Sequence, residues 1–287
     1  MSNISHSLLG KTAIVTGATN GIGKAAALAL AEMGAEVVLI ARNGTLVQQT
    51  VTEIKHETGN QKIDFLVADL SSQAEVRRVA AEYLASGRPL HILLNNAGAL
   101  FTERQLSADG IEMTFALNHL GYFLLTELLL DRIKQSAPAR IVNVASAAHE
   151  AATGGMNFDD LQYAKKYSAM ATYGQSKLAN ILFTRELARR LSGTQVTVNC
   201  LHPGFVATRF GHGTALMGFI MTLLRPFQRS IDKGARTSIY LCSSPEVENI
   251  SGEYFADCKI AKAKPYALDD AAAQKLWGIS EQMTERK

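Results

Sequence analysis

The chain has 287 residues, with 29 Lys and Arg against 26 Asp and Glu, and therefore a net charge of +3. Hydrophobic residues make up 47% and charged residues 19%, a balance that can bury a large core and excludes an intrinsically disordered chain. The charge is small and no dense Lys/Arg run with interleaved aromatics is present, so no nucleic-acid partner is expected.

Short β-rich segments alternate with helical sequence along the chain. A strand at 11–16, a glycine-rich turn, a helix over 21–35 and a strand at 36–41 predict a βαβ unit. Further strands are expected at 62–70, 90–95, 140–145, 195–201 and 252–258. Their continuous apolar residues are typical of a parallel sheet covered on both faces. The predicted fold is therefore α/β: a single-domain, Rossmann-type, doubly wound parallel sheet of about seven strands, with helices on both faces.

The location of the protein is predicted from segments that the sequence lacks. Residues 1–10 have neither the basic start nor the apolar stretch of a signal peptide, and no run approaches the roughly 18 apolar residues of a membrane span. The three cysteines, Cys200, Cys242 and Cys258, are widely spaced and favour a reducing compartment. The seven His residues show no metal-binding spacing, so no metal is expected. We therefore expect a soluble, cytoplasmic protein.

The turn at 16–23 (TGATNGIG) joins the first expected strand to the first expected helix. Glycines there permit positive φ and let a pyrophosphate approach the backbone, while the helix N-terminus offers free N–H groups. The spacing G-x-x-x-G-x-G differs from the familiar G-x-G-x-x-G and, taken alone, is also typical of an ordinary tight turn. Its position inside a βαβ unit favours a dinucleotide site.

The end of the second strand indicates which dinucleotide would bind. An acid at this point would bind the two ribose hydroxyls of NAD, but here Ala41 is followed by Arg42 and Asn43. No carboxylate repels a 2′-phosphate, and a guanidinium is available to pair with it. We hypothesise NADP(H) rather than NAD(H); the alternative is that Arg42 is a solvated surface charge.

Tyr173 and Lys177 are four residues apart, on one face of an expected helix. A nearby cation would lower the pKa of the phenol from about 10, so that Tyr173 could exchange a proton with a substrate oxygen. Ser146 follows the strand at 140–145, at the sheet edge where ligands bind, and its hydroxyl could hydrogen-bond a substrate carbonyl. Taken alone, the pair could be a solvated surface pair and Ser146 a loop cap.

Together the motifs resemble those of the short-chain dehydrogenase/reductase family, in order and approximate spacing, over residues 11 to about 205. They are TGATNGIG (16–23), NNAG (95–98), Ser146, YGQSK (173–177) and HPG (202–204). The resemblance implies a catalytic tetrad of Asn118, Ser146, Tyr173 and Lys177. Tyr173 would exchange the proton and Ser146 would hold the carbonyl. Lys177 would lower the pKa of Tyr173 and bind the nicotinamide ribose, and Asn118 would organise a water relay to Lys177.

The resemblance also implies a cofactor site and an assembly. Asp69 falls where the family contacts adenine, and Thr208 where it often meets the nicotinamide carboxamide. The residues expected to bind NADP(H) are Gly17, Thr19, Asn20, Gly21, Ile22, Gly23, Arg42, Asn43, Asp69, Leu70, Asn96, Ala97, Gly98, Tyr173, Lys177, Pro203, Gly204, Val206 and Thr208. Because the family commonly assembles through the helices bearing Asn118 and Tyr173, a homodimer or homotetramer is implied.

Three further segments resemble the retinol-dehydrogenase-like branch of the family: NHLGYFLLT (118–126), MNFDDLQ (156–162), and YFADCK with the distal AAAQKLW (254–277). In the position of the apolar, Met-containing segment at about 205–232 the family places a lid over the substrate. Such a lid suits a hydrophobic carbonyl or alcohol and would exclude water. The alternatives are an ordinary packed amphipathic helix and weak membrane-surface contact through 215–227.

The sequence thus predicts a single domain over 1–287, with a cofactor half at about 11–100. The predicted activity is that of an NADP(H)-dependent oxidoreductase acting on the CH–OH group of donors. It would reduce a hydrophobic aldehyde or ketone, as a carbonyl reductase does, or oxidise the matching alcohol, by direct hydride transfer with Tyr173 as proton donor or acceptor. A non-catalytic NADP(H)-binding scaffold or sensor is the alternative, although it would not need all four tetrad groups. A second alternative is an extended relative that performs epimerisation or dehydration on nucleotide sugars. This chain fits that alternative poorly, because such relatives have longer chains and a differently spaced glycine turn.

Overall fold

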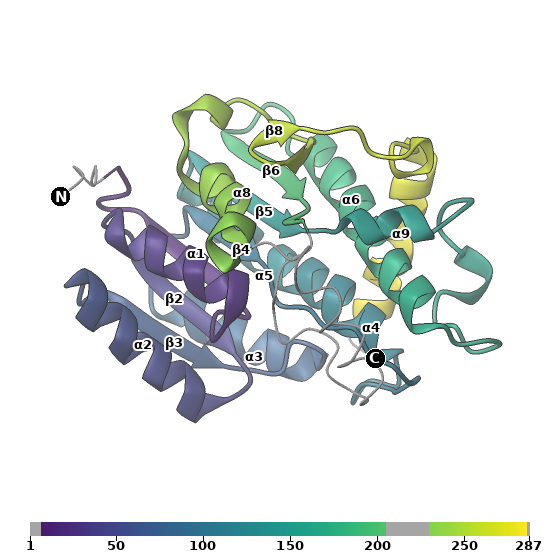
Figure 1. Cartoon of the computed structure of the whole chain (residues 1–287), viewed down its shortest axis with the longest axis horizontal. Coiled ribbons are helices and arrows are strands. Elements are labelled where there is room, and N and C mark those ends of the chain that lie inside the picture. The colour runs from purple at the N-terminus through teal and green to yellow at the C-terminus, as the bar shows by residue number, and fades with distance from the viewer. Residues whose placement is uncertain (1–6, 205–229, 286–287) are drawn as a thin grey trace.

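The computed structural model describes residues 7–204 and 230–285, and in these residues the strands form one sheet in the order β3-β2-β1-β4-β5-β6-β7-β8. All neighbouring strands are parallel except β7 and β8, which are antiparallel. The strands are β1 (Thr12–Thr16), β2 (Glu36–Ala41), β3 (Ile63–Val67), β4 (Ile92–Asn95), β5 (Ala139–Val144), β6 (Val196–Leu201), β7 (Tyr254–Ala256) and β8 (Lys259–Ile260). The predicted doubly wound parallel sheet is confirmed (Figure 1).

The last predicted strand, 252–258, is a short hairpin in the structure. Asp257 and Cys258 adopt positive φ values of 50° and 61°, which turn the chain back on itself. β8 then pairs with β7, so that the sheet gains an antiparallel edge strand beyond the seven that were predicted. The extra strand lies at the edge of the sheet, beyond β7.

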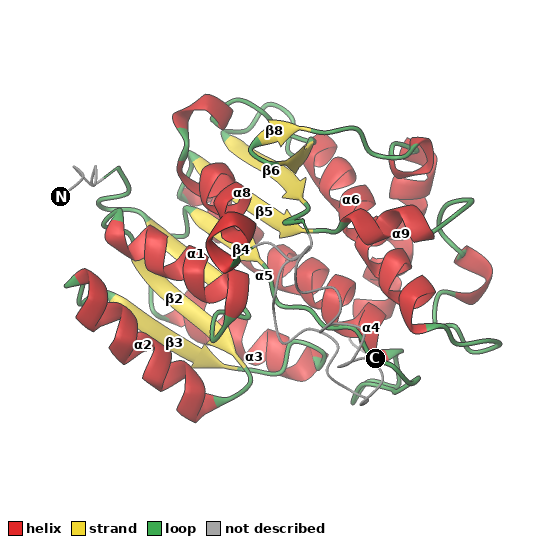
Figure 2. Cartoon of the chain, viewed as in Figure 1, coloured by secondary structure: helices red, strands yellow, loops and turns green. Residues whose placement is uncertain are grey.

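Helices cover both faces of the sheet (Figure 2). The α-helices in the described residues are α1 (Gly21–Glu32), α2 (Gly44–Thr58), α3 (Gln73–Ala85), α4 (Met113–Phe115), α5 (Gly121–Gln135), α6 (Ala169–Arg190), α8 (Ile231–Ser243) and α9 (Asp270–Thr284). A π-helical turn, η1 (Ala116–Leu120), joins α4 to α5, and the short 3₁₀ turns are η2 (Ala147–Ala151), η3 (Phe158–Asp160), η5 (Pro245–Val247) and η6 (Pro265–Ala267).

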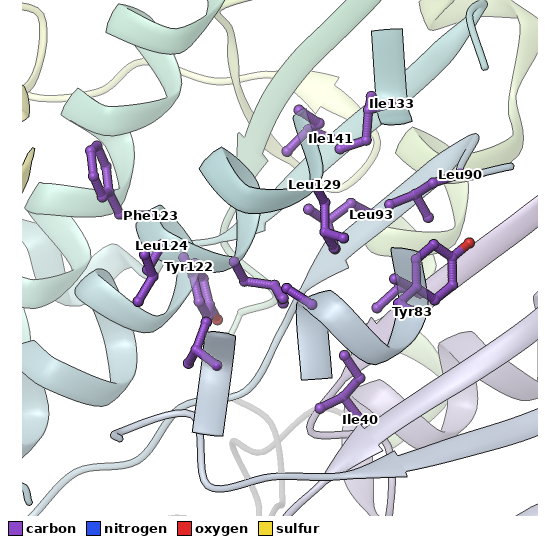
Figure 3. Packing of buried hydrophobic residues seen from close by; sticks show 14 of the residues in the cluster. Ile40, Tyr83, Leu90, Leu93, Tyr122, Phe123, Leu124, Leu129, Ile133 and Ile141 are labelled. Atoms are coloured by element: carbon purple, nitrogen blue, oxygen red, sulfur yellow. The ribbon is translucent and has the colours of Figure 1, made fainter. Parts of the chain in front are cut away.

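The core lies in two layers, one on each face of the sheet. Successive side chains of a strand point to opposite faces, and in β1 all five residues are buried. Ala13 and Val15 pack with residues of α1, α2 and α8, whereas Ile14 packs with residues of α3, α5 and α6. Figure 3 shows part of the cluster that contains Ile14, with Tyr122 and Leu129 of α5 among its residues. Burial on both faces explains why the strands read as continuous apolar runs.

The C-terminal helix α9 packs over α5 and α6. The Trp277 ring lies 5.0 Å from that of Phe123 and 5.8 Å from that of Phe183, measured between centroids. The Arg190 guanidinium stacks 4.0 Å from the centroid of the Trp277 ring. Self-association was predicted through the helices bearing Asn118 and Tyr173. Asn118 lies in the turn that leads into α5, and Tyr173 lies in α6, so α9 covers part of the surface of both helices.

Two sequence predictions concern the apolar segments. The predicted lid at 205–232, with its apolar stretch 215–227, lies outside the described residues except for its last three positions, where Ser230 caps α8 by accepting a hydrogen bond from the Lys233 amide. The expectation that no segment is long and apolar enough to cross a membrane is wrong for the described residues. The helical stretch Met113–Gln135 meets both criteria, although most of it is buried inside the fold.

Candidate active site

The glycine turn after β1 is bound to the NNAG loop after β4. The Thr16 hydroxyl accepts hydrogen bonds from the backbone amides of Asn96, at 2.8 Å, and Ala97, at 3.0 Å. The Asn96 side chain donates in return to the carbonyl oxygens of Thr16, at 2.9 Å, and Gly17, at 3.3 Å. Two motifs almost 80 residues apart in sequence are therefore held at the carboxyl ends of neighbouring parallel strands.

Two of the glycines in this turn are required by close approach of the backbone. Gly17 has a φ of 66°, and a Cβ atom there would lie 2.8 Å from the Cα of Ala97. A Cβ at Gly23 would collide with the Gly17 carbonyl oxygen and would lie 2.5 Å from the Asn96 amide nitrogen. Because Gly17 and Gly23 have no side chains, α1 packs directly against the turn, and the start of the helix faces the sheet edge.

The N-terminus of α1 suits a pyrophosphate. Its N-cap, Asn20, is extended and makes no side-chain capping bond, and no acidic residue lies in the first turn. The first amides of the helix, from Gly21 through Gly23, are therefore left for an anion, and the helix dipole favours negative charge at this point. The neighbouring Thr19 and Ile22 are half-buried. These features fit the dinucleotide that the motif predicts.

The predicted adenosine-binding residues lie together at the ends of β2 and β3, where Ala41 pairs with Val67. Arg42 is exposed directly after β2. The Asn43 side chain accepts a hydrogen bond of 2.9 Å from the Leu46 amide and so caps α2. The Asp69 carboxylate accepts hydrogen bonds from the amide and hydroxyl of Ser71, and the neighbouring Leu70 is buried. Asn43 and Asp69 therefore also hold local structure.

Ser146 and Tyr173 meet at the carboxyl end of β5. Ser146 follows the strand and accepts a hydrogen bond of 3.1 Å from the Ala148 amide. Burial raises the pKa of Tyr173 above its ordinary value, and a hydrogen bond with Ser146 opposes that rise. The lowering of this pKa expected from the sequence is therefore not found. The phenol is in its protonated form at neutral pH.

The Lys177 amine is buried between two tyrosine rings and a carbonyl. Its Nζ donates a hydrogen bond of 2.9 Å to the Val144 oxygen. It lies 5.6 Å from the centroid of the Tyr173 ring and 5.7 Å from that of Tyr122. Burial lowers the pKa of Lys177 to about 7, because the charged form loses its hydration. The amine is thus near the ring face of Tyr173, and its charge is marginal at neutral pH.

Asn118 lies in the π-helical turn, where the Gly121 amide bonds back to the Ala116 oxygen. Its side chain makes two hydrogen bonds of 2.9 Å with the backbone of Ala99 and a third, of 3.0 Å, to the Ser176 hydroxyl. Its own carbonyl oxygen accepts a hydrogen bond of 2.9 Å from the Asn180 amide. Asn118 thereby ties the loop after NNAG to α6.

Gly98 of the NNAG motif separates Asn118 from Lys177. A Cβ there would lie 3.1 Å from the Asn118 amide oxygen and 3.4 Å from the Lys177 nitrogen. All four predicted tetrad residues therefore lie in one region, at the carboxyl ends of β4 and β5. Asn180 and Tyr122 also lie here and were not predicted from the sequence. The signal for Tyr122 was its spacing of four from Asn118, the same spacing as in the Tyr173 and Lys177 pair.

The HPG motif follows β6 at the same sheet edge. Gly204 has a φ of 79°, and its amide donates a hydrogen bond of 3.1 Å to Nδ1 of His202. Pro203 and Gly204 are half-buried. The other two residues predicted here, Val206 and Thr208, lie outside the described residues.

This arrangement, a doubly wound sheet with a glycine turn after β1 and a Ser, Tyr and Lys cluster after β5, is that of short-chain dehydrogenases. The family model "short chain dehydrogenase" matches residues 11–159 and 161–216, and the chain belongs to this family of oxidoreductases, which bind a nicotinamide dinucleotide. Human retinol dehydrogenase 14 is 44% identical over 291 residues, covering 96% of this chain and 86% of the relative. Human retinol dehydrogenase 12 is 43% identical over 273 residues, covering 95% and 86%. The predicted likeness to the retinol-dehydrogenase-like branch is confirmed.

Solved structures agree with the fold. An uncharacterized protein from Mycobacterium paratuberculosis is 31% identical with a TM-score of 0.75, over 96% of this chain and 94% of that one. A short chain dehydrogenase from Burkholderia cenocepacia, in complex with NADP, is 26% identical with a TM-score of 0.69, over 87% and 96%.

The same comparisons correct the predicted location. The relatives that match nearly the whole chain are retinol dehydrogenases, enzymes named for an apolar alcohol, and the described residues include an apolar helical stretch of membrane-spanning length. The prediction of a soluble, cytoplasmic protein is therefore wrong. It rested on counting uninterrupted apolar residues, and such a count passes over Met113–Gln135, where polar residues interrupt a stretch of high mean hydropathy.

Proposed function

We propose that this chain is a single NADP(H)-dependent domain that reduces a hydrophobic aldehyde or ketone, or oxidises the matching alcohol. One observation carries the proposal. Tyr173 is hydrogen-bonded to Ser146, while the Lys177 amine lies 5.6 Å from the centroid of the same phenol ring. A proton donor, a hydroxyl that can bind a carbonyl oxygen and a buried amine therefore meet at the sheet edge where ligands of such folds bind.

The roles of the residues follow from this geometry. A bound nicotinamide coenzyme would supply or accept the hydride. The Ser146 hydroxyl would hydrogen-bond the carbonyl oxygen of the substrate and hold it beside the phenol. Tyr173 would pass its proton to that oxygen, and it is suited to donation because burial keeps the phenol protonated at neutral pH. Lys177 would stabilise the negative charge left on the ring. Asn118 would hold the loop after NNAG in place against α6.

The same sheet edge offers groups to hold the coenzyme. The open amides at the start of α1 would bind the pyrophosphate, and Gly17 and Gly23 keep that surface free of side chains. Exposed Arg42 would pair with a 2′-phosphate, which favours NADP(H) over NAD(H). The NADP complex of the related Burkholderia cenocepacia enzyme supports this preference.

Coenzyme choice is tested by titrating NADPH and NADH into the wild-type chain and into Arg42→Ala. The variant should lose at least about tenfold in NADPH affinity, corresponding to roughly 1.4 kcal/mol for a charge-assisted contact. Its affinity for NADH, which lacks the 2′-phosphate, should be unchanged and serves as the internal control. Equal NADPH affinities for the two proteins would refute the role of Arg42.

The reaction is tested with a panel of aldehydes, ketones and retinoids, followed by NADPH absorbance. The named substrate of the relatives makes the aldehyde of retinol the first compound to try. Tyr173→Phe should keep coenzyme binding but lose at least about a hundredfold in rate. Tyr240→Phe is the matched control, since it removes a surface hydroxyl that bonds Glu246, away from the site. Coenzyme binding without turnover of any compound would instead favour a scaffold or sensor.

A further inference from the structure

Two phenol rings flank the amine of Lys177, and only one of them has a role in the proposed reaction. Tyr173 belongs to α6, as does Lys177, whereas Tyr122 is the second residue of α5. The distances from Nζ to the two ring centroids, 5.6 and 5.7 Å, are nearly equal. Both lie within the roughly 6 Å over which an ammonium is attracted to the face of an aromatic ring.

We propose that Tyr122 is a positioning residue of the active site, whose ring keeps the Lys177 amine charged and seated against Tyr173. The inference deepens the proposed function, on which it rests, because it concerns the same site. Tyr122 would touch neither substrate nor coenzyme, and its effect would be exerted through Lys177.

The surroundings of Tyr122 assign this task to the ring rather than to the hydroxyl. The side chain is 1% exposed and belongs to the hydrophobic cluster that also contains Leu124 and Leu129 (Figure 3). Among the described residues its hydroxyl oxygen has no hydrogen-bond partner. A buried, unpaired hydroxyl costs free energy and contributes no contact to Lys177. The ring face is the part of the residue that meets the amine.

The remaining neighbours of Lys177 leave the charge without an anion. On β5 the Val144 carbonyl accepts its hydrogen bond, and across Gly98 lies the neutral amide of Asn118. The titratable groups that face the amine within the described residues are Tyr173 and Tyr122, both protonated phenols at neutral pH. Burial lowers the pKa of Lys177 to about 7. A ring that favours the charged form therefore decides how much ammonium is present at neutral pH.

The test measures the protonation of Lys177 directly. Protein labelled with ¹³C-lysine is titrated with pH, and its side-chain signal is identified by its absence in Lys177→Met. Tyr122→Leu should lower the titration midpoint by roughly 1 to 1.5 pH units, the equivalent of a desolvated cation–π contact. Tyr122→Phe keeps the ring face and should titrate within a few tenths of a unit of wild type.

A shape-matched variant separates charge stabilisation from packing. Trifluorophenylalanine placed at position 122 keeps the size of the ring but removes the negative potential of its face, so its midpoint should fall in the same direction as that of Tyr122→Leu. This variant also decides the matter if Tyr122→Leu does not fold. A wild-type midpoint for the fluorinated ring, or a large shift for Tyr122→Phe, would overturn the proposal.

An activity measurement separates this inference from the proposed function. In the carbonyl-reduction assay, the pH at which the rate of the fluorinated variant declines should move by the same amount as the NMR midpoint. A wild-type chain that turns over no substrate would defeat the proposed function, whereas the NMR titration would still decide whether the ring holds the charge.

Discussion

Substituting Gly23 by Ala tests whether α1 is held against the glycine turn by direct backbone contact. The two atoms nearest to the new methyl group would be the Gly17 carbonyl oxygen and the side-chain amide nitrogen of Asn96. The first belongs to the backbone of the turn. The second belongs to the side chain that bridges the Thr16 and Gly17 carbonyls. Neither neighbour can move without disturbing the connection between the ends of β1 and β4.

The expected cost can be worked from these contacts. Forcing one methyl group into a closely packed site costs about 1–3 kcal/mol, and weakening the Asn96 bridge adds about 1 kcal/mol. Alanine returns about 1 kcal/mol through its higher helix propensity. The net loss of about 2 kcal/mol should lower the melting temperature by roughly 3 to 4 °C in a chain of this size. NADPH should bind roughly tenfold more weakly, because the start of α1 is displaced.

Thermal unfolding followed by circular dichroism, without coenzyme, measures the first effect, and fluorescence titration with NADPH measures the second. Gly278→Ala is the matched control, since Gly278 also lies inside a helix, α9, but has open space where its Cβ would be. That variant should be as stable as wild type or more stable by up to about 1 kcal/mol. A Gly23→Ala protein that melts at or above the wild-type temperature would show that the close approach is not required.

Stability measurements check three further expectations. Burial lowers the pKa of Lys177 to about 7, so between that value and its ordinary pKa the unfolded chain binds one proton more than the folded chain, and wild-type stability rises with pH. Lys177→Met should therefore be more stable than wild type at pH 6, and the difference should shrink toward pH 10. Urea unfolding at both pH values measures this difference. Asn43→Ala removes the cap on the Leu46 amide and should cost about 1 kcal/mol, whereas an unchanged urea midpoint would contradict that role. Tyr122→Phe removes an unpaired buried hydroxyl and should melt at or above the wild-type temperature; a loss above about 1 kcal/mol would indicate that the hydroxyl has a partner.

The sheet could be predicted largely from the sequence because its central strands are buried on both faces. The predicted bounds of the second strand, 36–41, coincide with those of β2, and its six residues are almost wholly buried. The third strand was predicted to reach residue 70, but β3 ends at Val67. After it, the Asp69 carboxylate accepts hydrogen bonds from Ser71 and turns the chain out of the sheet. An apolar pattern does not reveal such a side-chain bond.

The candidate site, too, could be predicted from the sequence only in part. The motifs identified the residues that the structure brings together, since the ends of parallel strands meet at one sheet edge. The raised pKa of Tyr173 could not be predicted, because desolvation depends on the whole surrounding fold and here outweighs the opposing hydrogen bond with Ser146. The π-helical turn around Asn118 could not be predicted from the sequence either. It is bonded across five residues and locked by Ala99 and Asn180, which are distant in sequence.

The packing of α9 affects how readily the chain self-associates. The aromatic surfaces of Phe123 and Phe183 are sealed by Trp277, and a salt bridge between Arg185 and Asp270 fastens the start of the same helix. The chain thereby provides its own hydrophobic cover for this part of α5 and α6. A chain truncated before residue 269 would lack α9 and would expose the apolar side chains of α5 and α6 to solvent, so it should self-associate or precipitate.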